Sequence, residues 1–178
     1  MGLSITPIHC GVLSNVERSS QQYLTGCGER IDVPLIMWLI LGGERPIIVD
    51  VGVGTPDTVD EYQGRHLYQE KSPLDSLAAM GLEPADIGSV IITHAHWDHV
   101  LGLAALDFPA AKIYIQRSEL DFAMHPLPTQ RGLYHPREQA PYWCAHPAAP
   151  LRSPRTPSRF RAHCGASPRR TGARQEST

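Results

Sequence analysis

The sequence predicts an α/β fold in which one sheet is covered by helices. Two β-rich apolar runs lie on either side of a glycine-containing turn at residues 42–45, and strand-like and helix-like segments alternate after them. Strand and helix alternation that follows an opening hairpin is typical of layered α/β domains. The length of 178 residues suits one domain that is large enough to bury a core.

The chain opens with an irregular strand and a β-hairpin. The strand is predicted at residues 3–13, and Pro7 indicates an edge position because proline cannot donate a hydrogen bond to a neighbouring strand. The hairpin joins the apolar runs 31–41 and 46–49 through the turn Gly42-Gly43-Glu44-Arg45. The second run is continuously apolar rather than alternating, so we expect both of its faces to be buried.

A helix is predicted within S-P-L-D-S-L-A-A-M-G-L, residues 72–82. Ser72 suits the N-cap, Pro73 suits the first helical turn, and Gly81 suits the position that follows the helix. Three apolar residues repeat with helical spacing and are expected to dock on the sheet: Leu74, Leu77 and Ala78.

The rest of the predicted core alternates strand and helix. A buried strand is expected at residues 89–94, where S-V-I-I-T-H leads into a group of histidines. Residues 101–106 are expected to be short and helical, and residues 111–117 to form the next strand. A helix is then expected at 118–125, ended by Pro126.

The composition changes beyond about Pro141. Residues 151–178 hold seven of the 16 basic residues, one of the 18 acidic residues, and almost no large apolar residues. Such a segment cannot bury enough surface to offset the entropy of ordering, so we predict a partial domain at 1–140 and a disordered Arg/Pro/Ser-rich tail at 141–178. An abrupt change of this kind is also what a shifted reading frame produces in a G+C-rich gene.

Three histidines and an aspartate lie close together in T-H-A-H-W-D-H-V, residues 93–100. His94 and His96 follow a predicted strand, where side chains two residues apart share a face, so their imidazoles should project together. Asp98 and His99 are expected on the following turn, close enough to contribute to the same ion or an adjacent one. Imidazole and carboxylate suit zinc, iron or manganese, of which zinc is commonest. The alternatives are surface histidines or a helix cap formed by Asp98.

This stretch resembles the H-x-H-x-D-H signature of the metallo-β-lactamase superfamily. The family's opening hairpin is similar to P-L-I-M-W-L-I-L-G-G-E-R-P-I-I-V-D-V-G, and its next helix and strand are similar to L-A-A-M-G-L-E-P-A-D-I-G-S-V-I-I-T-H. The block that follows the signature in N-acyl-homoserine lactonases is similar to K-I-Y-I-Q-R-S-E-L-D-F-A. The resemblance covers roughly residues 5–140. It implies the N-terminal half of a four-layer αββα sandwich.

The resemblance implies a role for each residue of the signature. His94 and His96 would bind a first zinc ion, and Asp98 and His99 would bind a second. A hydroxide shared by the two ions would attack a carbonyl, and Asp98 would orient that hydroxide and receive its proton. Asp50 would hold a ligand histidine in place, and the alternative for Asp50 is a plain turn carboxylate.

The family pattern needs more ligands than this chain supplies in recognisable form. It requires a further histidine, a bridging aspartate and a distal histidine after the signature, but no aspartate follows Asp121. His163 has roughly the right separation but is expected to belong to the tail. The earlier histidines are expected in surface loops: His125, His135 and His146. Because catalytic zinc sites usually have three protein ligands, we expect fewer or weakly bound zinc ions and little or no hydrolysis.

The favoured function is metal-dependent hydrolysis of a small-molecule lactone or ester, of the acyl-homoserine lactone type that the lactonase branch implies. One alternative is thioester hydrolysis of the glyoxalase II type, whose signature also fits T-H-x-H-x-D-H. Another is a non-catalytic fragment. Trp97 is expected either to flank the site or to serve as a half-buried packing residue.

Composition limits the expected location and partners. No N-terminal stretch resembles a secretory signal, and the longest apolar run, residues 34–41, is too short to span a bilayer. The four cysteines form no C-x-x-C pair, so we expect free thiols in a cytoplasmic protein. We expect no membrane partner. Residues 151–178 have a single aromatic residue, Phe160, so we expect no nucleic acid partner either, and the open half-sandwich should favour homo-oligomers.

Overall fold

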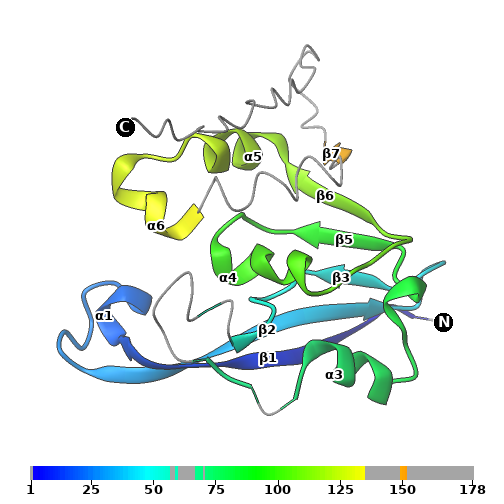
Figure 1. Ribbon diagram of the computed structural model, residues 1–178, viewed down its shortest axis with the longest axis horizontal. Coiled ribbons are helices and arrows are strands. Elements are labelled where there is room, and N and C mark those ends of the chain that lie inside the picture. The colour runs from blue at the N-terminus through cyan, green and yellow to red at the C-terminus, as the bar shows by residue number, and fades with distance from the viewer. Residues whose placement is uncertain (1, 57–58, 60–66, 70, 135–148, 152–178) are drawn as a thin grey trace, which may run out of the picture.

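The computed structural model describes residues 2–56, 59, 67–69, 71–134 and 149–151. Within them the chain forms one mixed sheet with the strand order β4-β1-β2-β3-β5-β6-β7 (Figure 1). Antiparallel pairing joins β4, β1, β2 and β3, and parallel pairing joins β3, β5, β6 and β7. The strands are β1 Ser4–Glu17, β2 Arg30–Leu41, β3 Ile47–Val49, β4 Leu67–Tyr68, β5 Ser89–Ile92, β6 Lys112–Gln116 and β7 Ala149–Leu151.

Short helices alternate with the strands after the hairpin, which confirms the predicted α/β class. The helical segments near the signature follow β5 and β6, as expected. The α-helices are α1 Arg18–Gln21, α3 Pro73–Ala79, α4 Trp97–Val100, α5 Arg117–Met124 and α6 Arg131–Tyr134. The 3₁₀ helices are η1 Pro84–Asp86, η2 Leu101–Ala104 and η3 Pro128–Gln130.

The predicted hairpin is confirmed as β2 and β3. Trp38 pairs with Val49 across it. Gly42, in the turn, has a φ of 101°, which glycine adopts without strain. A Cβ at this position would lie 2.5 Å from the carbonyl oxygen of Gly2, so only glycine fits here.

The first strand is longer than the predicted 3–13 and runs to Glu17. Its pairing with β2 shifts register near Gly11 and near Asn15, and these bulges interrupt the sequence pattern on which the shorter prediction depended. The edge position of Pro7 is confirmed, because β4 pairs with β1 only beyond the first bulge.

One face of the sheet carries the core. The side chains that point to this face are buried on β1, β2, β3, β5 and β6: Ile8, Met37, Leu39, Ile48, Val90, Ile92, Ile113 and Ile115. Leu77 of α3 and Leu101 of η2 belong to the same buried cluster. The helical segments therefore cover this face.

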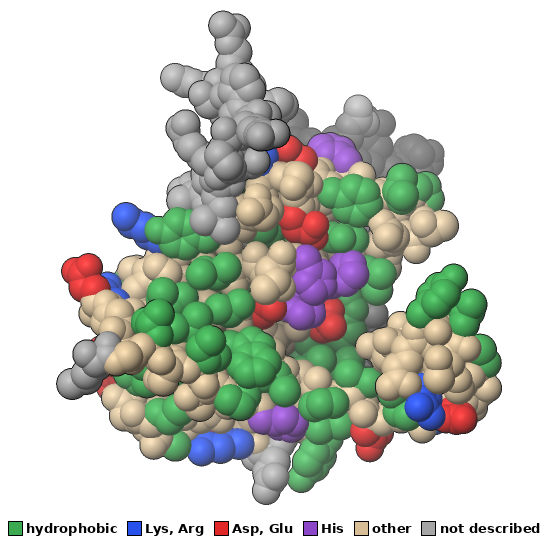
Figure 2. All heavy atoms as spheres, turned by 180° about the vertical axis from the view of Figure 1, so that it is seen from behind, with side chains coloured by type: hydrophobic (Ala, Val, Ile, Leu, Met, Phe, Trp, Pro, Cys, Tyr) green, Lys and Arg blue, Asp and Glu red, His purple; other side chains and the backbone are tan. Residues whose placement is uncertain are grey.

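The opposite face is partly open, so the prediction that the hairpin's second strand is buried on both faces is wrong. Ile48 is buried, but Ile47 and Val49, which point the other way, are only half-buried. On the same open face, Ile36 and Trp38 of β2 keep exposed fractions of 36% and 41%. Figure 2 shows hydrophobic side chains gathered on the side that is seen from behind. The described residues do not supply a layer that buries this face.

The helix α3 begins and ends where the sequence predicts. The Ser72 hydroxyl accepts a hydrogen bond from the Asp75 N–H at 3.1 Å, and the Asp75 carboxylate accepts one from the Ser72 N–H at 3.3 Å. These two bonds form a capping box. Gly81 lies just after the helix with a φ of 73°, as expected of a C′ glycine.

The expected docking stripe of α3 is only partly right. Leu77 is fully buried, but Leu74 is 38% exposed and Ala78 is also exposed. The buried pair is Pro73 and Leu77, which lie four residues apart and therefore share a helix face. In a helix of this length only one turn contacts the sheet, so the neighbouring positions stay in solvent.

The structure describes little of residues 141–178. Ala149–Leu151 form β7, parallel to β6, in a segment predicted to be disordered. The apolar pattern missed this strand because only three residues form it, too few to show a period of alternating apolar residues. The predicted boundary at residue 140, the rest of the predicted disorder and three histidines lie outside the described residues: His135, His146 and His163.

His125 is described and exposed at the end of α5, as expected of a surface position. None of the helices in the described ranges has the length and apolar character needed to cross a membrane.

Candidate metal centre

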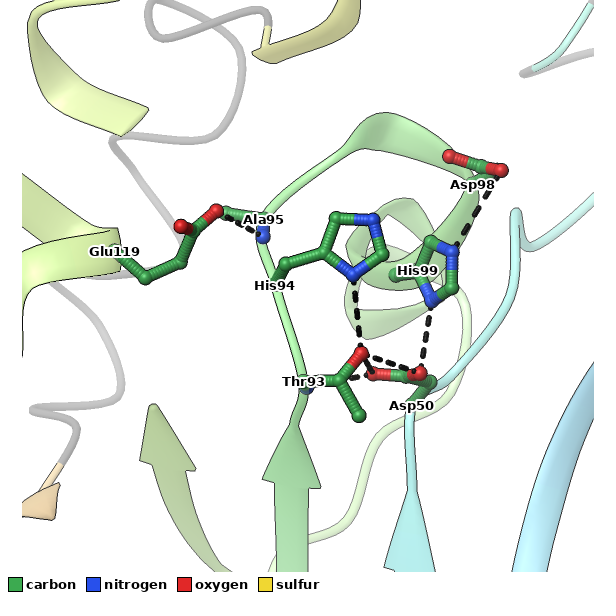
Figure 3. Close-up of polar contacts among 7 residues, drawn as sticks. All are labelled: Asp50, Thr93, His94, Ala95, Asp98, His99 and Glu119. Carbon is green, nitrogen blue, oxygen red and sulfur yellow. Dashed lines mark hydrogen bonds and ion pairs between the residues drawn. The ribbon is translucent and has the colours of Figure 1, made fainter. Parts of the chain in front are cut away.

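The candidate site lies at the carboxyl ends of β3 and β5. Asp50 directly follows β3, and Thr93 and His94 directly follow β5. The two strands are parallel neighbours, so their ends meet at one edge of the sheet. The Asp50 N–H continues the ladder by donating to the carbonyl oxygen of Ile91 at 2.8 Å. Figure 3 shows the side chains that this arrangement brings together.

Asp50 is the buried centre of the hydrogen-bond network. Its carboxylate accepts bonds from the Thr93 N–H at 2.8 Å, from the Thr93 hydroxyl at 2.8 Å, and from Nδ1 of His99 at 2.8 Å (Figure 3). Burial opposes ionisation of Asp50, but the bonds from His99 and Thr93 outweigh it and lower the pKa of the carboxyl group. The backbone of Asp50 has a φ of 57°, a left-handed conformation that aspartate tolerates better than most residues.

His99 is held by Asp50 from one side of its ring. Burial alone would lower the pKa of His99, but the hydrogen bond to Asp50 and the charge of Asp98 raise it. With Nδ1–H donated to Asp50, the lone pair of neutral His99 is on Nε2. This nitrogen lies 3.7 Å from Oδ2 of Asp98. Asp98 and His99 were expected on a turn, and they lie in the single-turn helix α4.

Thr93 sets the orientation of His94. Its hydroxyl has one proton, which the Asp50 carboxylate accepts, so its oxygen is free to accept from Nδ1 of His94 at 3.1 Å. This assigns the proton of neutral His94 to Nδ1 and its lone pair to Nε2. Burial lowers the pKa of His94, and the nearby imidazoles of His99 and His96 lower it further. The neutral form, which binds metals, is therefore favoured.

The structure brings three imidazoles together. The ring centroid of His94 lies 4.0 Å from that of His99 and 4.6 Å from that of His96. Burial lowers the pKa of His96 as well, against the opposing charges of Asp98 and Glu119. The arrangement therefore offers neutral imidazole nitrogens beside a carboxylate.

The donors suit zinc in kind and protonation state, but among the described residues fewer than three of them converge on one point. In the part of the chain that the structure describes, no group of three or more histidine, cysteine, aspartate or glutamate side chains is placed to hold one metal ion. Among the described residues, His94, His96, Asp98 and His99 therefore lie near one another without forming such a group. Structural and catalytic zinc sites need three or four protein ligands.

Sequence reasoning missed three residues around the site. Thr93 bridges Asp50 and His94, Glu119 of α5 accepts a hydrogen bond from the Ala95 N–H at 2.9 Å, and the Tyr134 ring packs on His96. The position of Thr93 directly before the signature was the one sequence signal that could have indicated its role. Glu119 and Tyr134 are distant in sequence and gave none.

Trp97 lies in the core with an exposed fraction of 5%. Trp97 therefore packs in the core, and it is more deeply buried than the half-buried position of the packing alternative.

The sequence matches the Metallo-beta-lactamase superfamily over residues 36–164. An N-acyl homoserine lactonase of Bacillus sp is 30% identical over 110 residues, which are 55% of this chain and 42% of the lactonase. The N-acyl homoserine lactonase AttM of Agrobacterium fabrum is 35% identical over 60 residues, 34% of this chain and 22% of that protein. A crystallised variant of B. thuringiensis AiiA with N-decanoyl-L-homoserine at its active site is 25% identical, with a TM-score of 0.59, over 76% of this chain and 58% of that one.

The fold, the residues at the ends of β3 and β5, and the matched range agree: the chain belongs to the metallo-beta-lactamase superfamily. Curated proteins similar to this chain over 110 residues include N-acyl homoserine lactonases of Bacillus sp and Bacillus thuringiensis. The chain spans about two fifths of the length of these relatives and just over half of the solved structure.

Proposed function

We propose that this chain carries the signature half of a zinc-dependent hydrolase that opens lactones of the acyl-homoserine type. The observation that carries the proposal is the buried Asp50 carboxylate, which holds His99 directly and His94 through Thr93. A histidine that binds zinc through one ring nitrogen typically donates the N–H of its other ring nitrogen to a carboxylate, as His99 donates to Asp50. The lactonase activity of the relatives supports lactones as the substrate class.

Each residue of the signature has a proposed task. His94 and His96 would hold one zinc ion, and Asp98 and His99 a second. Bound zinc would supply Lewis acidity toward a carbonyl oxygen and lower the pKa of water. Asp98 would receive a proton at a carboxylate oxygen, and Asp50 would keep the Nδ1 proton of His99 in place so that Nε2 stays free.

The incomplete ligand set limits what this polypeptide achieves alone. We propose that it binds zinc weakly and hydrolyses lactones slowly or not at all. Calorimetric titration with zinc chloride, run beside an assay of N-hexanoyl-homoserine lactone hydrolysis, tests both parts. Weak binding that is lost in the double variant His94→Ala, His96→Ala supports the site. Tight binding of two zinc ions with rapid turnover contradicts the proposed impairment, and absence of zinc binding contradicts the site itself.

A non-catalytic role is the second candidate, and the lack of three converging ligands among the described residues favours it. The two candidates differ in one measurement: lactone hydrolysis, however slow, that is lost in the double variant His94→Ala, His96→Ala identifies the hydrolase, and zinc binding with no detectable hydrolysis of any lactone or thioester favours the non-catalytic role. Hydrolysis of a glutathione thioester but not of a lactone would instead favour the glyoxalase II alternative.

We also propose a cytoplasmic, self-associating protein. Both described cysteines are free thiols, which suits a reducing compartment. Burial raises the pKa of the Cys10 thiol to about 11, so this thiol is unreactive. Self-association follows from the open apolar face of the sheet.

A further inference from the structure

Glu119 connects the helix α5 to the loop that carries His94 and His96. Its Oε1 accepts a hydrogen bond from the Ala95 N–H at 2.9 Å, and Figure 3 shows the carboxylate reaching across to this amide. Ala95 lies between the two histidines, and its side chain is fully buried. The peptide that links the two imidazoles is thus held by a bond from outside the loop and by packing from inside the core.

Tyr134 of α6 lies near the same carboxylate. Burial of the Tyr134 hydroxyl, the nearby negative charge of Glu119 and a hydrogen bond to Glu119 all raise the pKa of this tyrosine. The ring of Tyr134 packs edge to face on His96, with centroids 4.7 Å apart, and on Phe122, with centroids 5.3 Å apart. Glu119 and Tyr134 therefore contact both the backbone and one ring of the H-x-H segment.

We propose that Glu119 is a positioning residue of the metal centre, whose carboxylate fixes the peptide between His94 and His96 and, together with Tyr134, the ring of His96. This inference rests on the proposed metal-binding function. A hydrogen bond from an amide to a carboxylate is stronger than one between neutral groups, so it resists rotation of the peptide. Residues that orient metal ligands in this way typically change metal affinity by roughly 10–100-fold when removed.

Two substitutions at this position separate the hydrogen bond from the bulk of the side chain. Glu119→Ala removes the acceptor, whereas Glu119→Gln keeps an oxygen that can accept from the Ala95 N–H. Asp121→Ala is the matched control, because Asp121 is an exposed carboxylate on the same helix. Zinc affinity of the full chain is measured by competition with a chromogenic chelator. We expect roughly tenfold weaker zinc binding in Glu119→Ala and near wild-type binding in the other two variants.

A second readout does not need metal. Hydrogen exchange of the Ala95 amide, followed by NMR in the metal-free chain, should be slow in the wild type and in Glu119→Gln, and roughly tenfold faster in Glu119→Ala. If the wild type binds no zinc, the proposed function fails, and this measurement alone decides whether Glu119 positions the loop.

Equal zinc affinity and equal Ala95 exchange in Glu119→Ala and the wild type would overturn the inference. A loss of zinc affinity in Glu119→Gln as large as that in Glu119→Ala would overturn it as well. If Glu119→Ala does not fold, Tyr134→Phe takes its place, because it keeps the ring on His96 and removes only the bond to Glu119. Faster Ala95 exchange in Tyr134→Phe supports the inference, and unchanged exchange contradicts it.

Discussion

A single buried carboxylate, that of Asp50, connects three segments of the candidate site. It accepts hydrogen bonds from the backbone and hydroxyl of Thr93 and from the ring of His99, residues that lie 43 and 49 positions away. An exposed fraction of 5% leaves little water to replace these bonds. The position of His94 depends on Asp50 as well, through the Thr93 hydroxyl.

Replacing Asp50 with alanine should lower the free energy of unfolding by about 1.5–3 kcal/mol, because donors on Thr93 and on the half-buried His99 lose a charged hydrogen-bond acceptor. Urea denaturation of the metal-free chain measures the change. Asp121→Ala, which removes an exposed carboxylate, should have an effect close to zero. A similar effect for both variants would show that the network contributes little to stability.

The pair of Asp50 and His99 should also give stability a specific pH dependence. The pKa of Asp50 is lowered below its usual 3.8 in the fold, so its contribution is lost as pH falls through that lowered pKa. The pKa of His99 is raised above its usual 6.5, so its contribution is complete below 6.5 and is lost as pH rises through the raised pKa. The two contributions overlap between about pH 4 and 6.5.

The predicted quantity is the difference in free energy of unfolding between the wild type and Asp50→Asn. It should be largest between about pH 4 and 6.5 and shrink above that window, in metal-free buffer. Because both proteins keep His94 and His96, the opposite pH effects of these two histidines largely cancel in the difference. A difference that grows from pH 6.5 to pH 8.5 would contradict the proposed ion pair.

Among the elements, the α4 and η2 helices are docked tightly on the loop that follows β3. The Val51 N–H donates to the carbonyl oxygen of His99 at 3.0 Å, and the Gly102 N–H donates to that of Gly52 at 3.0 Å. A Cβ at Gly102 would lie 1.9 Å from the Val51 carbonyl oxygen, so only glycine allows this approach. The approach keeps His99 within reach of Asp50.

Gly102→Ala should therefore destabilise the chain by about 2–3 kcal/mol, because the clash is with backbone that cannot move aside. Thermal unfolding measures the loss. Gly132→Ala is the control: it lies in α6, where an added Cβ meets nothing within 4 Å, so its effect should be small or slightly stabilising. If Gly102→Ala unfolds like the wild type, the helix and the loop are less closely packed than described.

At the scale of the whole molecule, the described residues leave apolar side chains exposed on one face of the sheet. Three large apolar side chains on this face are substantially exposed: Ile5 at 64%, Ile36 at 36% and Trp38 at 41%. The register of β1 and β2 places them on the same side of the sheet. A continuous apolar face of this kind favours contact with another apolar surface, and a second copy of the chain offers one.

Trp38→Ser should reduce self-association, because it removes the largest apolar side chain from the middle of this face. Sedimentation velocity at several protein concentrations measures the change. Tyr23→Ser is the control, since Tyr23 is 89% exposed and lies outside the sheet strands. If both substitutions act equally, or neither does, self-association does not occur through this face.

Local signals in the sequence were enough to predict several elements. The hairpin was predicted from its glycine turn, α3 from Ser72, Pro73 and Gly81, and the histidine segment from its position after an apolar strand. Each of these depends on residues that are adjacent or a few positions apart, whose backbone preferences are properties of the residues themselves. The burial predicted for Leu74, for Ala78 and for both faces of β3 was wrong for one reason. Periodicity shows which side chains share a face, but only the packing of other elements decides whether that face is covered.

Local patterns in the chain were enough to predict an α/β sheet with a histidine segment at the end of a strand, because hydrophobic periodicity and turn residues act locally. Which residues meet at that strand end depends on the folded chain. The contact of Asp50 with His99, and that of Glu119 with Ala95, join segments 49 and 24 residues apart. Such contacts arise when parallel strands and their helices pack side by side, and no local preference encodes them.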